Sequence, residues 1–343
     1  MPMYNLSRRQ VLGSATGLAA AAIVHPAAAA DRLAVRLDWL PWGVHAAFHL
    51  AAAKGWFEKN GLDVSLEDGN GSVTSVQLVG NGQFDVGHAS LGPMTMARSR
   101  GVPVKAIANF LRLNDIGLML PTELGITTVP QLRGKKLAYT ASSLETPFID
   151  PFLATGGLTR ADVELIGVDG AAKPGVFIAG RVDGVFSAIP NLLPTIQPRR
   201  PAMAMRFADH GLSFPSFGLV ANETSLKEKP DQLKRFASVV AGTWTYIFDG
   251  HQDEGAQAIL NARPQAKLPF ALMREQLDLL KTFFFTDATK DLPIGVMAMP
   301  DWEAALHTLT TANLLEQQQP AANYFTNDLL DRSLIASVAS GAA

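Results

Sequence analysis

Cysteine is missing from this 343-residue sequence. Its absence excludes thiolate zinc sites, iron–sulfur clusters, cysteine nucleophiles and redox CxxC chemistry. An oxidising compartment remains compatible with it, because disulfides are allowed there and not required. Basic residues are not in excess either: 29 Lys and Arg stand against 31 Asp and Glu, a formal net charge of -2. Since nucleic-acid binding needs a clustered basic surface that displaces counterions, we expect no nucleic-acid partner.

Several catalytic signatures are missing as well. The sequence has no G-x-S-x-G nucleophile elbow, no H-E-x-x-H zinc helix and no P-loop. His45 and His49 have a spacing that can hold a metal on one helix face, yet no Glu lies between them and no third ligand is suggested nearby. We therefore expect no enzyme activity, no metal and no cofactor.

One apolar stretch of small residues lies near the N-terminus. It covers about fourteen residues, 11–24, whereas a membrane-spanning helix needs about twenty. Arg8 and Arg9 precede it and A-x-A sites follow it, which is the pattern of an export signal. The S-R-R-x-x-L motif from Ser7 resembles the bacterial twin-arginine signal, and an ordinary Sec signal is the alternative. We predict that residues 1–30 are removed on export, which gives a periplasmic protein without a membrane span.

Beyond this stretch, short apolar runs alternate with segments of helical periodicity, a pattern typical of βαβ units. Strands are expected at 33–37, 64–66, 84–86 and 104–108, with helices at 44–59, 72–79 and 92–100. A second series has strands at 116–120, 136–139, 163–168, 182–187 and 202–207, with helices at 147–155 and 173–179. One more strand is expected at 217–221, and from residue 229 the chain looks entirely helical. The fold class is therefore α/β.

The order of these units indicates one domain interrupted by another. We predict a discontinuous lobe 1 at 31–115 plus 219–343 and an inserted lobe 2 at 116–218. The chain would cross between the lobes near 112–120 and near 213–220. Two strands as crossings form a hinge, and a hinge implies a cleft that can close.

Four segments resemble a known group of proteins. They are LDWLPWGVHAAFHLAAAKGWFEKNGLDVSL at 37–66, GSVTSVQLVGNGQFDVGHAS at 71–90, LRGKKLAYTASS at 132–143 and GRVDGVFSAIPN at 180–191. They resemble periplasmic binding proteins for thiamine-pyrimidine precursors, which are similar to nitrate, taurine and alkanesulfonate binding proteins. The resemblance implies a type II periplasmic binding protein fold, with two α/β lobes around a ligand cleft. It also implies a monomer that delivers a small-molecule solute to the transmembrane subunits of an ABC permease.

One departure from the pyrimidine-precursor branch concerns the ligand. That branch usually carries an acidic residue close to the Asn of the last segment, whereas residues 187–194 read SAIPNLLP here. A missing carboxylate removes a partner for amino or amidine nitrogens, so the ligand of that branch does not transfer directly.

In a parallel sheet the ligand lies beyond the carboxyl ends of the strands, so the loops there hold the candidate residues. The loop after the first strand carries Asp38, Trp39, Trp42 and His45. The rings can stack on a planar ligand, and Asp38 and His45 can hydrogen bond to it. The alternatives are that the tryptophans pack in the core or between the lobes, that Asp38 caps a turn and that His45 is structural.

Further candidates lie in the equivalent loops of both lobes: Ser90, Leu91, Ser142, Ser143, Glu145, Asn191 and Phe214. The helix that follows Ser90 has free N-terminal amides, which favour a carboxylate, a sulfonate or a polar heteroatom. The lobe 2 serines and Asn191 can hydrogen bond to the opposite side of the ligand. Glu145 can complement a positive ligand, and Phe214 can cover it. Each of these residues can instead cap a helix or pack locally.

The leading interpretation is an extracytoplasmic solute-binding protein that closes over a planar aromatic or heterocyclic solute, such as a pyrimidine precursor. Binding of alkanesulfonate, taurine or nitrate is the alternative within the same class. An enzyme acting on a pyrimidine-like substrate and a receptor-linked ligand sensor are the alternatives from other classes.

Overall fold

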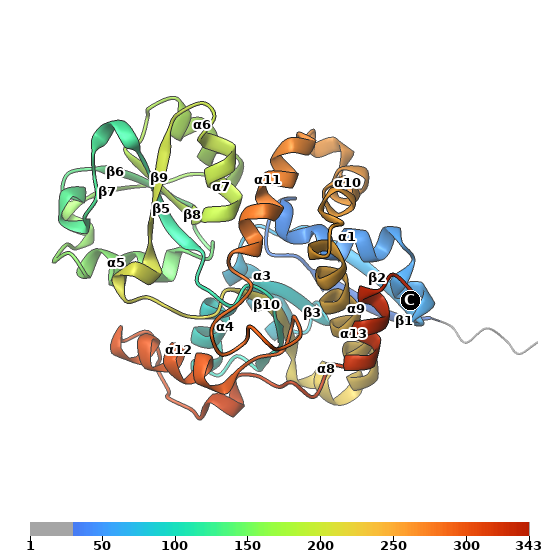
Figure 1. Cartoon of the computed structure of the whole chain (residues 1–343). Coiled ribbons are helices and arrows are strands. Elements are labelled where there is room, and N and C mark those ends of the chain that lie inside the picture. Colours follow the sequence, from blue (N-terminus) through green and yellow to red (C-terminus); the bar gives the residue numbers. More distant parts are fainter. Residues whose placement is uncertain (1–29, 343) are drawn as a thin grey trace, which may run out of the picture.

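A computed structural model describes residues 30–342. The predicted export signal therefore lies, except for Ala30, outside the described residues. The chain forms two lobes, each built on a five-stranded sheet with helices packed against it (Figure 1). We call them the first lobe and the second lobe, after the first and second sheets. Between residues 30 and 342, no helix combines the length and the apolar character needed to cross a membrane.

The first sheet is mixed, with parallel and antiparallel strand pairs. Its strands lie in the order β2 (Leu62–Glu67), β1 (Asp31–Arg36), β3 (Val86–Ser90), β10 (Phe217–Asn222) and β4 (Val104–Asn109). β1 pairs parallel with β2 and β3, and β10 runs antiparallel between β3 and β4. β3 and β10 are fully buried because helices and neighbouring strands cover both of their faces.

The second sheet repeats this plan. Its order is β7 (Glu164–Gly167), β6 (Lys136–Tyr139), β8 (Gly184–Ala188), β5 (Ile116–Pro121) and β9 (Ala202–Arg206). β6 pairs parallel with β7 and β8, and β5 runs antiparallel between β8 and β9. The predicted α/β class with two lobes is confirmed.

Two segments connect the lobes, 110–115 from β4 to β5 and 207–216 from β9 to β10. The two segments contact each other, because the Ser216 hydroxyl donates a hydrogen bond to the Asp115 carboxylate and the Ser216 N–H donates to the Leu111 carbonyl. β10 lies wholly in the first sheet, so the return from the second lobe is complete at Phe217. The exact lobe limits given above stay a prediction.

The helices cover the sheets and connect the strands. In the first lobe they are α1 (Ala46–Ala53), α2 (Trp56–Lys59), α3 (Ser72–Gly80) and α4 (Leu91–Ser99). In the second lobe they are α5 (Ile149–Ala154), α6 (Lys173–Ile178) and α7 (Ile189–Ile196). The C-terminal helices are α8 (Glu223–Glu228), α9 (Pro230–Phe248), α10 (Gln252–Ala262), α11 (Phe270–Lys281), α12 (Met299–Thr311) and α13 (Arg332–Ala339). α11 contacts α7 and so bridges the two lobes (Figure 1).

The structure differs from the predicted elements in several places. The helix predicted at 44–59 is interrupted, because Gly55 adopts a left-handed conformation with φ 67° between α1 and α2. The third strand begins at Val86 and not at residue 84. The C-terminal part is not entirely helical: residues 282–298 form a loop, where Asn109 bridges Gly295 and the Arg112 guanidinium donates to the carbonyls of Pro293 and Val296.

Candidate functional site

A cavity lies between the two lobes at the carboxyl ends of the strands. The first lobe lines it with Asp38, Trp39, Trp42, Ser72 and Phe217, and the second with Ser143, Leu144, Ser187, Ala188 and Asn191. The space left for the centre of a water molecule is about 10 Å³, roughly enough for one water. A ring-sized solute can therefore enter only when the lobes separate or a lining side chain moves.

Close backbone contacts join the segments that surround the cavity. The Asp38 carbonyl accepts a hydrogen bond from the Gly71 N–H at 2.7 Å, and the Ser142 carbonyl of the other lobe accepts one from the Val73 N–H at 3.2 Å. A Cβ atom on Gly71 would lie 2.2 Å from the Ser142 oxygen, so only glycine permits this approach. The two lobes are thus in direct contact beside the cavity.

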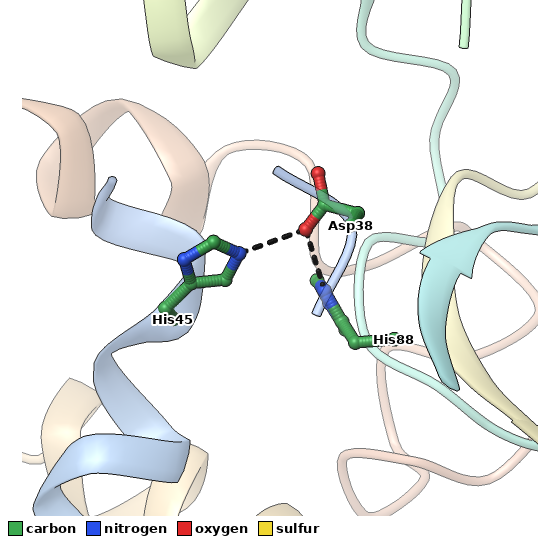
Figure 2. A group of neighbouring side chains, drawn as sticks. All are labelled: Asp38, His45 and His88. Atoms are coloured by element: carbon green, nitrogen blue, oxygen red, sulfur yellow. Dashed lines mark hydrogen bonds and ion pairs between the residues drawn. The ribbon is translucent and has the colours of Figure 1, made fainter. Parts of the chain in front are cut away.

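Asp38 is the centre of a buried polar cluster on the first-lobe side (Figure 2). Its Oδ1 lies 2.8 Å from His45 Nε2 and 2.9 Å from His88 Nδ1. Both imidazole nitrogens must donate, because a carboxylate only accepts hydrogen bonds. Burial alone would raise the pKa of Asp38, but the hydrogen bonds from His45 and His88, together with the electrostatic attraction of the two rings, outweigh it and lower the pKa to about 2. The carboxylate is therefore ionised at neutral pH.

Two histidines of this cluster, His88 and His49, have a lowered pKa. Burial lowers the pKa of His88, whose ring stacks on Phe217 at 5.1 Å between ring centroids. Burial and the repulsion from His45 and Arg263 lower the pKa of His49 to about 3. His45 Nδ1 and His88 Nε2 are buried without a hydrogen-bond partner among the described residues. A second proton on the His88 ring would leave a charged N–H without an acceptor.

Asp38, His45 and His88 also meet the distance criterion for a metal site, since their ligand atoms lie within 4.8 Å of one another. A metal would take the two nitrogens that now donate to Asp38 and would move the ring protons to His45 Nδ1 and His88 Nε2. Those atoms have no acceptor among residues 30–342, whereas metal-binding histidines normally donate their second N–H. The arrangement therefore suits a hydrogen-bonded carboxylate better than a metal centre.

Glu145 in the second lobe is paired inside the protein. Its Oε1 lies 2.6 Å from Lys173 Nζ, its Oε2 accepts the Ser143 hydroxyl at 2.5 Å, and both charged side chains are buried. Lys173 Nζ also donates to the Phe186 carbonyl at 2.9 Å and lies 5.6 Å from the centroid of the Trp39 ring. Glu145 does not line the cavity, and its charge is compensated. It positions Ser143, which does line it.

The structure brings together part of the predicted site. The predicted residues that line the cavity are Asp38, Trp39, Trp42, Ser143 and Asn191. His45 lies behind Asp38, and the Ser142 side chain is not in the lining, although its carbonyl joins the lobes.

Three other predicted residues lie elsewhere. The Ser90 hydroxyl is buried and makes no capping hydrogen bond to α4, so the capping alternative is wrong. Leu91 is a core residue, and Phe214 packs on Phe148 with ring centroids 4.4 Å apart.

Sequence reasoning missed several lining residues: Ser72, Leu144, Ser187, Ala188 and Phe217. Ser72 and Phe217 have ordinary roles in a predicted helix start and a predicted strand, and Ser187 and Ala188 end a buried strand. The position of Ser187 at the carboxyl end of β8 was the one available signal.

Trp39 separates the cavity from an outer cleft. The outer cleft is lined by Trp39, Leu40, Gly69, Asn70, Thr140, Ala141, Asp169 and Gly170. A Cβ atom on Gly170 would lie 2.2 Å from the Trp39 ring, so the indole packs directly on the backbone of the second lobe. Trp39 is therefore the partition between the enclosed space and the surface.

Comparison with known proteins gives the family. The model of the family described as NMT1/THI5 like matches residues 42–254. The chain belongs to this family. The formylaminopyrimidine-binding protein of Halalkalibacterium halodurans is 22% identical over 302 residues, which are 87% of this NMT1/THI5-like chain and 91% of that relative. A 4-amino-5-hydroxymethyl-2-methylpyrimidine phosphate synthase of Saccharomyces cerevisiae is 32% identical over 110 residues, 32% of each chain.

Solved structures give the fold of this NMT1/THI5-like protein. The alkanesulfonate-binding protein SsuA from Xanthomonas axonopodis pv. citri, bound to MOPS, superposes with a TM-score of 0.67 at 15% identity. The match covers 86% of this chain and 98% of SsuA. The predicted periplasmic binding protein fold is confirmed, as is the resemblance to this group of binding proteins.

Proposed function

We propose that this protein is an exported solute-binding protein that closes its two lobes over a small planar heterocyclic solute. The observation that carries the proposal is the enclosed inter-lobe cavity with aromatic walls formed by Trp39, Trp42 and Phe217. Flat rings bury their faces well against aromatic side chains, and hydroxyl groups at the other wall can read the ring edge. Ser72, Ser143 and Ser187 supply such hydroxyl groups.

The names of relatives support the same class of solute. The Halalkalibacterium halodurans relative is named for binding formylaminopyrimidine, and its match covers most of both chains. We propose that this protein likewise works in the periplasm and hands its solute to an ABC permease. We also propose that it performs no chemical step, since the match to the yeast synthase covers only 32% of either chain.

Binding of a sulfonate or nitrate is the second candidate, and the fold shared with SsuA favours it. The cavity argues against it, because Asp38 would place a negative charge beside a buried anion. Among the residues that line the cavity, none carries a positive charge to compensate.

A thermal-shift screen of the mature protein tests the proposal. The panel contains 4-aminopyrimidine, 2-methylpyrimidine, nitrate, taurine and ethanesulfonate. A planar heterocycle at 100 times its dissociation constant should add about 2.7 kcal/mol to the free energy of unfolding. Shifts with the anions alone, or no shift with any heterocycle, would refute the proposal.

A further inference from the structure

We infer that Asp38 determines specificity by charge, so that the cavity selects a planar solute with a delocalised cationic N–H edge, such as an amidinium or a protonated aminoheterocycle. The inference rests on the proposed function and specifies its solute class. The residues that enforce the selection are His45 and His88, which hold Asp38 in position from behind.

The first step is the charge of the cavity. Asp38 is the single ionisable side chain among the described residues that line it. The charged pair directly behind the opposite wall, Glu145 and Lys173, is buried and mutually neutralised. Any solute enclosed here therefore meets the negative charge of Asp38 at short range, in a site from which water is largely excluded.

The second step is the free hydrogen-bonding capacity of Asp38. Both imidazoles donate to Oδ1, and Oδ2 accepts no hydrogen bond from any residue between 30 and 342. Figure 2 shows Oδ2 directed away from both rings. A solute N–H that approaches Oδ2 therefore finds an oriented, ionised acceptor that needs no rearrangement.

The third step is the shape of the preferred cation. The aromatic walls offer ring faces, and the Trp42 and Phe217 rings pack edge to face with centroids 5.5 Å apart. Ring faces attract cations, and flat delocalised cations also stack on them. A compact ammonium group is strongly hydrated, and it would have to give up its hydration shell to enter a space this narrow. A flat delocalised cation is more weakly hydrated and loses less. The walls therefore add a preference for a flat cation to the charge preference of Asp38.

Three probes of nearly identical shape separate charge from fit: benzamidine, benzamide and benzoate, which are a cation, a neutral molecule and an anion at pH 7.5. Calorimetric titration of the mature protein should give the tightest binding for benzamidine. We expect benzamide to bind about tenfold to a hundredfold more weakly, because it replaces a charged hydrogen bond by a neutral one. Benzoate should bind more than about a hundredfold more weakly than benzamidine.

The variant Asp38→Asn should remove the preference and bring benzamidine and benzamide within about threefold of each other. Asp63→Asn is the matched control, because it removes the same formal charge from an exposed position on β2 and should keep the probe order. If Asp38→Asn does not fold, the order of affinities of the three probes for the unsubstituted protein still tests the inference.

Suppose that neutral heterocycles bind. Equal affinities for benzamidine and benzamide, or tighter binding of benzoate than of benzamidine, would then overturn the inference. Failure of all three probes while neutral heterocycles bind would overturn it as well. Failure of every planar ring, charged or neutral, would instead overturn the proposed function on which it rests.

Discussion

At the scale of single residues, the contact of Trp39 with Gly170 between the lobes leaves no room for a side chain on residue 170. A methyl group on Gly170 would lie 2.2 Å from Cζ2 of the indole, so the ring or the loop must shift. Gly175 in α6 is a matched control, because a Cβ atom there would meet nothing within 4 Å.

We predict that Gly170→Ala weakens solute affinity about fivefold to a hundredfold, the cost expected of an overpacked contact in the closed state. Gly175→Ala should leave affinity unchanged. Calorimetric titration with the tightest-binding heterocycle of the screen measures both variants. Equal affinities for the two variants would show that Trp39 does not pack on Gly170 when the solute is bound.

Asp115 is a second residue whose environment has a measurable consequence. It is buried in the segment that connects the lobes, and burial raises its pKa to about 7 although the Ser216 hydrogen bond lowers it. The charge of Asp38 adds to the rise. The native state thus binds this proton more tightly than the unfolded chain does, so its stabilisation is complete below about pH 4 and is lost as the pH rises through about 7.

Unfolding in urea at several pH values checks this sign. Between pH 4 and pH 8 the unsubstituted protein should lose about 4 kcal/mol relative to Asp115→Asn, whose amide does not titrate. Asp209→Asn changes an exposed position of the other connecting segment. Its free energy of unfolding should depend on pH in the same way as that of the unsubstituted protein. If Asp115→Asn shows the same pH dependence as the unsubstituted protein, the buried carboxyl group does not titrate as described.

Residue contacts of this kind are the part of the site that the sequence could not supply. The rule that ligands lie beyond strand ends led to Asp38, Trp39 and Trp42. It could not reveal that His88, 50 residues away, would bond to Asp38, or that Lys173, 28 residues away, would neutralise Glu145. Those pairings depend on how distant strands and helices pack, and no spacing in the chain encodes them.

At the scale of elements, α11 has a role that its amphipathic pattern does not suggest. Its buried Gln276 accepts a hydrogen bond from the Gly43 N–H and donates one to the Asn191 carbonyl, both at 2.8 Å. One side chain thus joins the first-lobe binding loop to the start of α7 in the second lobe.

We predict that Gln276→Ala weakens solute affinity about fivefold, because the hydrogen bond to Asn191, worth about 1 kcal/mol, crosses between the lobes and is made only in the closed state. Gln257→Ala on α10 is the control, since that side chain is exposed and bonds to Asn261 within its own helix. An unchanged affinity of Gln276→Ala would mean that α11 does not fasten the lobes.

Most strands and helices could be predicted, because burial imposes a period on the sequence. The predictions failed where a single backbone conformation, or a partner distant in the sequence, determines the local structure. Gly55 breaks the first helix through its positive φ, and Arg112 fixes the loop at 282–298 from more than half the chain away.

At the scale of the whole molecule, solute binding depends on movement between the two lobes, which the order of the strands and helices in the sequence predicts. The enclosed space holds about one water, so uptake and release of a ring require the lobes to part or a lining side chain to move. A solute closes them only through its greater affinity for the closed form.

Small-angle X-ray scattering of the mature protein, without and with a saturating heterocycle, tests this most directly. We predict that the radius of gyration falls when the solute is added and that the solute is recovered with its mass unchanged. An unchanged radius of gyration at saturation, or a chemically altered solute, would contradict it.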